Sequence, residues 1–157
     1  MAKKQNLTGG CQCGHIRYQI NGEPKALYAC HCLDCQAQSA SAFGLSMWVN
    51  RNDFNLLNGE LKFWSTKADD ARQKHCAFCP DCGTRIYHAG DDDEIISLKG
   101  GSLDDKSILK PVAHIWTKRA HNWLDLERLD VPCYLIEPND FNEILSTWEK
   151  QAAENPD

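Results

Sequence analysis

The chain has 157 residues, enough for one domain with a substantial core, and we expect a single domain over residues 1–157. Its formal net charge of −5 disfavours a nucleic-acid partner, because neutralising phosphates requires clustered Lys and Arg. No apolar run approaches the roughly 20 residues that span a membrane, and the N-terminal segment MAKKQNLTGG lacks the apolar core of a secretory signal. We therefore expect a cytoplasmic protein, whose nine cysteines are better suited to metal binding or thiol chemistry than to disulfides.

Short β-rich runs separated by turn signals predict a mainly antiparallel β fold. The run HIRYQI, residues 15–20, alternates polar and apolar side chains, which is typical of a half-buried strand. Asn58-Gly59 lies between FNLL and ELKFW and predicts a hairpin. Four further runs have strand-like composition: Phe43–Val49, Leu61–Ser65, Arg85–His88 and Ile95–Leu98.

The C-terminal segment predicts a short helix at about residues 140–153. Asp140 is a candidate N-cap, with Glu143 three positions later as the partner of a capping box. Helical spacing places four apolar side chains on one face, which we expect to pack on the core: Phe141, Ile144, Leu145 and Trp148.

Two pairs of cysteines are suited to a closed metal site. Cys11 and Cys13 lie in the glycine-rich segment GGCQCG, and Cys79 and Cys82 form a Cys-x-x-Cys knuckle in FCPDCG. Four thiolates are the usual ligand set of a structural zinc. Such a site would join the beginning of the chain to its middle, and the free energy of zinc binding would contribute to folding.

A third group, CHCLDC, holds three cysteines: Cys30, Cys32 and Cys35. Zinc with three protein ligands keeps a position for water or substrate, as in catalytic sites. One zinc ion with three thiolates has a net charge of −1. This charge suits thiol or alkoxide exchange better than attack by hydroxide. The alternative is a closed structural site with a histidine as fourth ligand, for which the chain offers His75, His88, His114 and His121. We expect the ring of His31 to point away from such a metal site, because its neighbours in the sequence, Cys30 and Cys32, would be ligands.

Two cysteines remain outside these groups. Cys76 precedes the knuckle by three positions and is expected to be an idle, buried thiol. Cys133 lies in the apolar segment VPCYLI and is expected to pack in the core.

An ordered set of motifs between about Leu7 and Tyr134 resembles the glutathione-dependent formaldehyde-activating family, whose members share the β-tent zinc-binding fold. The motifs are GGCQCGHIRY, CHCLDCQ, FCPDCGT, GGSLDD and HIW. The resemblance implies a core at about residues 7–134 and two zinc ions per chain. It assigns the structural zinc to Cys11, Cys13, Cys79 and Cys82, and the catalytic zinc to Cys30, Cys32 and Cys35.

The resemblance also implies a carbon–sulfur lyase activity that joins formaldehyde to glutathione, giving S-hydroxymethylglutathione. The expected partner is then a small thiol or its aldehyde adduct, with glutathione as the family's thiol, and neither a nucleic acid nor a membrane. His114 and Asp34 are candidates for proton transfer. Where family members often carry a basic residue and a glycine after the third catalytic cysteine, this chain has Gln36 and Ala40.

Two other functions remain open from the sequence. The first is a zinc-binding interaction module without catalysis. The second is a thiol oxidoreductase, similar to methionine-sulfoxide reductases, with Cys133 as the nucleophile.

Overall fold

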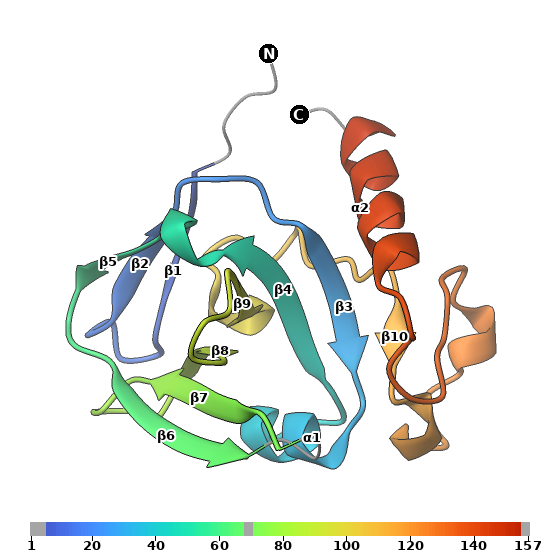
Figure 1. Ribbon diagram of the computed structural model, residues 1–157, viewed down its shortest axis with the longest axis horizontal. Helices are drawn as coiled ribbons and strands as arrows, with labels where there is room; N and C mark the ends of the chain where they lie inside the picture. The colour runs from blue at the N-terminus through green and yellow to red at the C-terminus, as the bar shows by residue number, and fades with distance from the viewer. Residues whose placement is uncertain (1–5, 68–70, 155–157) are drawn as a thin grey trace. The chain divides into compact units, whose positions relative to one another are not determined.

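The computed structural model describes residues 6–67 and 71–154, and it is mainly β (Figure 1). In these residues ten strands form a three-stranded and a seven-stranded sheet, and a helix follows near the C-terminus. The predicted fold class is confirmed. The described residues divide into two compact units: residues 6–24 with 47–67 and 71–108, and residues 25–46 with 109–154.

The first unit contains the whole three-stranded sheet and most of the larger one. In the small sheet β2 (Arg17–Ile20) is the central strand and pairs antiparallel with β1 (Leu7–Gly10) and β5 (Phe54–Asn58). The larger sheet continues in this unit from β4 (Gly44–Asn50), whose second half belongs here. Its further strands follow in the spatial order β9 (Ile95–Lys99), β8 (Arg85–Ala89), β7 (Gln73–Phe78) and β6 (Lys62–Lys67).

The alternation predicted for residues 15–20 is confirmed by burial. Ile16, Tyr18 and Ile20 are fully buried while the residues between them are half-buried. Burying each such side chain contributes about 1.5–3 kcal/mol. The Tyr18 hydroxyl is 2.7 Å from Ser102 Oγ, and its ring stacks on Phe54 at a centroid distance of 5.2 Å. These contacts fix the strand that follows the first cysteine pair.

The hairpin predicted at Asn58-Gly59 is wrong. β5 pairs with β2 in the small sheet, whereas β6 pairs with β7 in the large one. Asn58 Nδ2 donates a hydrogen bond of 2.8 Å to the carbonyl of His15, and Gly59 has φ of +85°. A Cβ at Gly59 would lie 2.6 Å from that same carbonyl oxygen. The Asn-Gly pair therefore makes a tight crossover between two sheets, because close approach to the His15 backbone excludes a side chain there.

The second unit is built around β3 (Ala26–Cys30), which is buried at all five positions. β10 (His114–Ile115) pairs with it in parallel, and β3 leads into helix α1 (Leu33–Ser39) (Figure 1). The first half of β4 also belongs to this unit. Neither β3 nor α1 was predicted from the sequence, because a strand buried on both faces has no polar alternation and a helix of seven residues gives too little periodicity.

Helix α2 (Asn142–Glu154) confirms the predicted C-terminal helix within one or two residues. Ile144 is fully buried, and the Phe141 ring lies 6.1 Å from that of Tyr28 on β3. Asp140 accepts a hydrogen bond of 2.9 Å from the backbone of Asn142. Glu143 accepts one from the Tyr134 hydroxyl instead of completing a capping box. No helix in the described part of the chain is long and apolar enough to cross a membrane.

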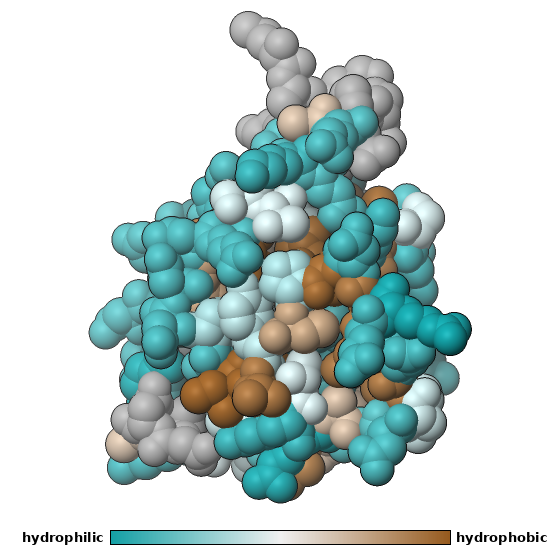
Figure 2. Space-filling view, turned by 90° about the vertical axis from the view of Figure 1, so that its right-hand side faces the viewer, coloured by the Kyte–Doolittle hydropathy of each residue, from teal (hydrophilic) through white to brown (hydrophobic). Residues whose placement is uncertain are grey.

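Several large apolar side chains of the second unit are exposed to solvent. Figure 2 shows one face of the molecule, on which apolar residues lie among hydrophilic ones. The exposed apolar residues of the second unit are Leu33, Trp123, Leu129, Leu135 and Ile136.

Candidate functional site

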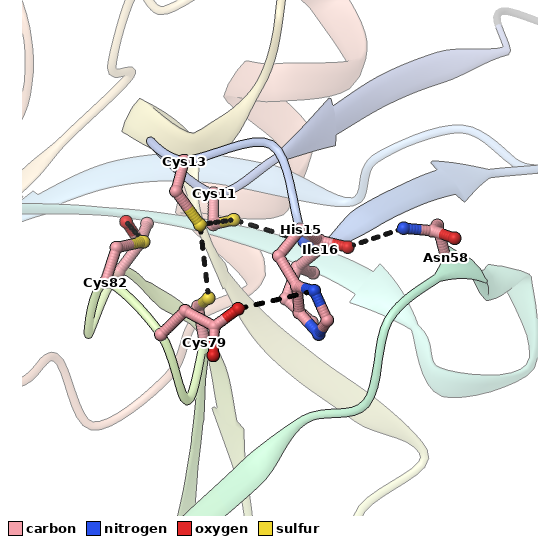
Figure 3. Close-up of polar contacts among 9 residues, drawn as sticks. Cys11, Cys13, His15, Ile16, Asn58, Cys79 and Cys82 are labelled. Carbon is pink, nitrogen blue, oxygen red and sulfur yellow. Dashed lines mark hydrogen bonds and ion pairs between the residues drawn. The ribbon is translucent and has the colours of Figure 1, made fainter.

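Four cysteines of the first unit bring their sulfur atoms within 4.8 Å of one another: Cys11, Cys13, Cys79 and Cys82 (Figure 3). The Sγ atoms of Cys11 and Cys13 are 3.4 Å apart, and those of Cys13 and Cys79 are 3.8 Å apart. A tetrahedron with zinc–sulfur bonds of about 2.3 Å has sulfur–sulfur edges of about 3.8 Å. The spacing therefore fits a four-thiolate metal site.

Two similar turns present these four sulfurs. In the first turn Gly14 N donates to Cys11 O at 3.2 Å, and in the second Gly83 N donates to Cys79 O at 2.9 Å. Both glycines have positive φ, +84° and +74°. Because glycine reaches this backbone region without strain, each turn can close sharply enough to place two sulfurs on the same side.

Hydrogen bonds favour the thiolate form, which binds metals, at two cysteines of the first cluster, Cys11 and Cys82, whereas burial raises the pKa of Cys79. The Thr84 hydroxyl lies 3.2 Å from Cys82 Sγ, and this contact, with the backbone of Thr84, lowers the pKa of Cys82 to about 5. The backbone N–H of Ile16 donates to Cys11 Sγ at 3.1 Å. Thr84 follows directly after the glycine of its turn, and Ile16 lies two residues after the glycine of the other.

The second cluster comprises Cys30, Cys32 and Cys35, whose sulfurs also lie within 4.8 Å of one another. Cys30 ends β3, Cys32 is the N-cap of α1, and Cys35 lies in the first turn of that helix. Cys32 Sγ accepts a hydrogen bond of 3.3 Å from Cys35 N. Hydrogen bonds with Cys32 and Cys35 and burial raise the pKa of the Cys30 thiol. Three crowded thiols ionise together only beside a cation, so this donor set also fits a metal ion.

Among the described residues, no histidine, aspartate or glutamate joins the second cluster as a fourth ligand. The ring of His31 points to His114, as the distance of 2.8 Å between His31 Nε2 and His114 Nδ1 shows. The expectation that His31 points away from the cysteines agrees with this geometry. The arrangement favours the three-ligand hypothesis over the closed site.

His31 and His114 form a buried pair beside the second cluster. Their exposed fractions are 0% and 5%, and their rings stack at a centroid distance of 5.2 Å. Burial lowers the pKa of His31 to about 4 and also lowers the pKa of His114. Both imidazoles are therefore neutral at pH 7, with one ring donating its N–H to the other. His114 was a candidate from the sequence, but its partner His31 was not, because only the pairing of β10 with β3 brings the two rings together.

Asp34 is not brought together with His114. Its carboxylate is exposed in the first turn of α1, and no hydrogen bond or ion pair in the described part of the chain joins it to His114 or to the cysteines. It remains a candidate only by its place next to Cys35 in the sequence.

The remaining cysteines differ from each other in burial. Cys76 is buried in β7 and belongs to neither cluster, in agreement with the expectation of a buried thiol. Cys133 is exposed, so the prediction of core packing is wrong. It lies outside the named strands, in an isolated bridge with His114, and its thiol donates to the carbonyl of Val131 at 3.7 Å.

The two residues after the third cysteine that depart from the family pattern have distinct structural roles. Gln36 Nε2 donates to the carbonyls of His31 at 2.8 Å and Arg119 at 3.0 Å. Ala40 ends α1 in the left-handed region, with φ of 48° and ψ of 41°, which a glycine adopts without strain.

The fold and these clusters define a mainly β protein with two cysteine sites suited to metal ions. A sequence model described as "Glutathione-dependent formaldehyde-activating enzyme" matches residues 6–119, and the chain belongs to this family. A crystal structure of a Rhodobacter sphaeroides protein from a structural genomics project has 15% identity and a TM-score of 0.50. The match covers 80% of this chain and 98% of that one, and it shows the fold alone. No curated protein matches the chain.

Proposed function

We propose that the protein is a zinc-dependent enzyme of the carbon–sulfur lyase type. Its substrate would be the thiol adduct of a small aldehyde, similar to S-hydroxymethylglutathione. The observation that carries this proposal is the second cluster, with three cysteines converging and no fourth ligand in the described part of the chain. Cys32 is only half-buried, so an incoming thiol could reach this side. Membership of the family supports the same reaction class.

The cysteines of the second cluster would hold the zinc, and those of the first would hold a second, structural zinc. Zinc bound by Cys30, Cys32 and Cys35 would supply a Lewis acid that lowers the pKa of a thiol and polarises an oxygen. The three thiolates would bring the site to a net charge of −1. This charge favours exchange of a thiol substrate over the formation of hydroxide.

We assign proton transfer to the His31–His114 pair in preference to Asp34. Cleavage of the adduct breaks its carbon–sulfur bond, gives the electron pair to sulfur and releases the hydroxyl proton as the carbonyl forms. A neutral imidazole can accept that proton and later return it to the thiolate. Low pKa values keep both rings neutral at pH 7 and thus able to accept. The direct hydrogen bond between the rings would let a proton pass from one to the other.

The proposal is tested by assaying formaldehyde exchange with glutathione for the wild type, Cys32→Ser and Cys133→Ser. We expect the first variant to lose activity and one equivalent of zinc. The second should keep both, because Cys133 is exposed and outside both clusters. Full activity in the Cys32→Ser variant would refute the lyase proposal. Loss of a reductase activity in Cys133→Ser would instead support the oxidoreductase alternative.

The alternative of an interaction module is favoured by one observation, the exposed apolar side chains of the second unit. Trp123 is 71% exposed, as is Leu135. If the protein is such a module, the wild type should show no aldehyde–thiol exchange, and Trp123→Ser should abolish binding of its protein partner. An enzyme without such a partner would show exchange in both the wild type and Trp123→Ser, and neither would retain a partner.

A further inference from the structure

The turn after β10 is fixed directly beside the second cluster. Ile115 lies opposite Cys30 in the parallel pair, and the backbone N–H of His31 donates to its carbonyl at 3.0 Å. The chain then passes through Trp116 into the 3-10 turn Thr117–Arg119. This turn therefore begins two residues after β10, the strand that pairs with β3 where β3 ends at Cys30.

Trp116 has a backbone conformation that is costly for a residue with a side chain. Its φ of 58° and ψ of 34° place it in the left-handed region. Such conformations are strained for a residue with a Cβ and persist where the surrounding structure holds them. Here three backbone hydrogen bonds from Trp116, Thr117 and Lys118 to residues 134–136 hold the turn.

Gln36 fastens the same turn to the helix of the second cluster. Its Nε2 donates to the carbonyl of Arg119 at 3.0 Å and to that of His31 at 2.8 Å. One side chain therefore joins the end of the turn, the residue between two cysteine ligands, and α1. Because both amide hydrogens are used in this way, Gln36 itself has no donor left for a substrate.

The two positively charged side chains of the turn, those of Lys118 and Arg119, differ in their contacts. Lys118 Nζ lies 4.8 Å from the centre of the Trp116 ring and is held there by a cation–π contact. Arg119 is exposed, and no hydrogen bond or ion pair of its guanidinium occurs in the described part of the chain. Arg119 is thus a cation positioned by its backbone, with its planar donor group available.

We propose that Arg119 is a specificity-determining residue that binds a carboxylate of the thiol substrate. This inference rests on the proposed function. A zinc site with three thiolates is anionic, in a chain of net charge −5, so an anionic thiol meets repulsion unless a cation is near. Arg119 supplies that cation and matches a carboxylate with two parallel hydrogen bonds. The site therefore takes carboxylate-bearing thiols in preference to neutral ones.

The test compares a carboxylate-bearing thiol with a neutral one on cobalt-substituted protein. 3-Mercaptopropionate and 2-mercaptoethanol are titrated separately, and the change in the cobalt absorption spectrum gives each dissociation constant. Arg119→Gln should weaken 3-mercaptopropionate roughly two- to fivefold, the range of a single exposed ion pair, and leave 2-mercaptoethanol unchanged. Arg119→Lys should keep part of the affinity. Arg128→Gln is the matched control, because Arg128 is exposed and paired with Asp125 at 2.9 Å.

The outcomes separate this inference from the proposed function. If Arg119→Gln binds each of the two thiols as tightly as the wild type does, the inference is overturned and the lyase proposal is left intact. Failure of both thiols to change the wild-type spectrum would overturn the proposed function, and the inference with it. A loss of affinity for both thiols in Arg119→Gln would assign Arg119 a structural role and also overturn the inference. Added salt should weaken only the binding of 3-mercaptopropionate.

Discussion

Replacing Gln36 by Leu tests whether one side chain holds the turn that carries Arg119. Leu has a similar size but cannot donate to the carbonyls of His31 and Arg119. A hydrogen bond contributes about 0.5–1.5 kcal/mol to stability. The carbonyl of Arg119 can be hydrated when its bond is lost, because that contact is exposed. We therefore expect a loss of about 1–2 kcal/mol, which corresponds to a decrease in Tm of roughly 2–8 °C for a chain of this length.

The assay is thermal unfolding of the zinc-loaded protein, followed by circular dichroism, together with the thiol titrations described above. Gln36→Glu should be more destabilising than Gln36→Leu, because a carboxylate would face two carbonyl oxygens. Gln19→Leu is the control, because Gln19 is half-buried on β2 and its side chain makes no hydrogen bond in the described part of the chain. A Gln36→Leu variant as stable as the wild type, with unchanged thiol binding, would refute the reasoning.

Three further predictions follow from the clusters, the end of α1 and an exposed ion pair. Mass spectrometry under native conditions should find about two zinc ions in the wild type and about one in Cys32→Ser; an unchanged count would contradict a separate second site. Ala40→Gly should stabilise the protein by about 1 kcal/mol in urea unfolding, because it removes a left-handed alanine, and a destabilised variant would contradict this account. The hydrogen bond from Arg17 lowers the pKa of Asp104 to about 2 from its ordinary 3.8, so this pair stabilises the fold above pH 3.8 and the contribution is lost as the pH falls towards 2. Asp104→Asn should reduce that acid sensitivity, and an identical pH profile would show that the ion pair contributes nothing.

The sequence alone indicated which cysteines are suited to bind a metal ion. Spacing within GGCQCG, CHCLDC and FCPDCG was sufficient for this, because sulfurs two or three residues apart can converge through a local turn. The tertiary structure decided that Cys13 and Cys79, 66 positions apart, bring their two pairs together. The alternation of polar and apolar residues at 15–20 and the apolar face of α2 could also be predicted, because each follows from a local periodicity of the sequence.

The tertiary structure decided what depends on partners distant in the sequence. Asn58-Gly59 has the local signature of a hairpin, yet β5 and β6 find their partners in different sheets. Cys133 lies in an apolar segment but is exposed, because burial depends on what packs against a segment as well as on its composition. The His31–His114 pair and the Gln36–Arg119 contact each join residues 83 positions apart. No local pattern encodes such contacts, because they form only when β10 and its following turn pack beside β3 and α1.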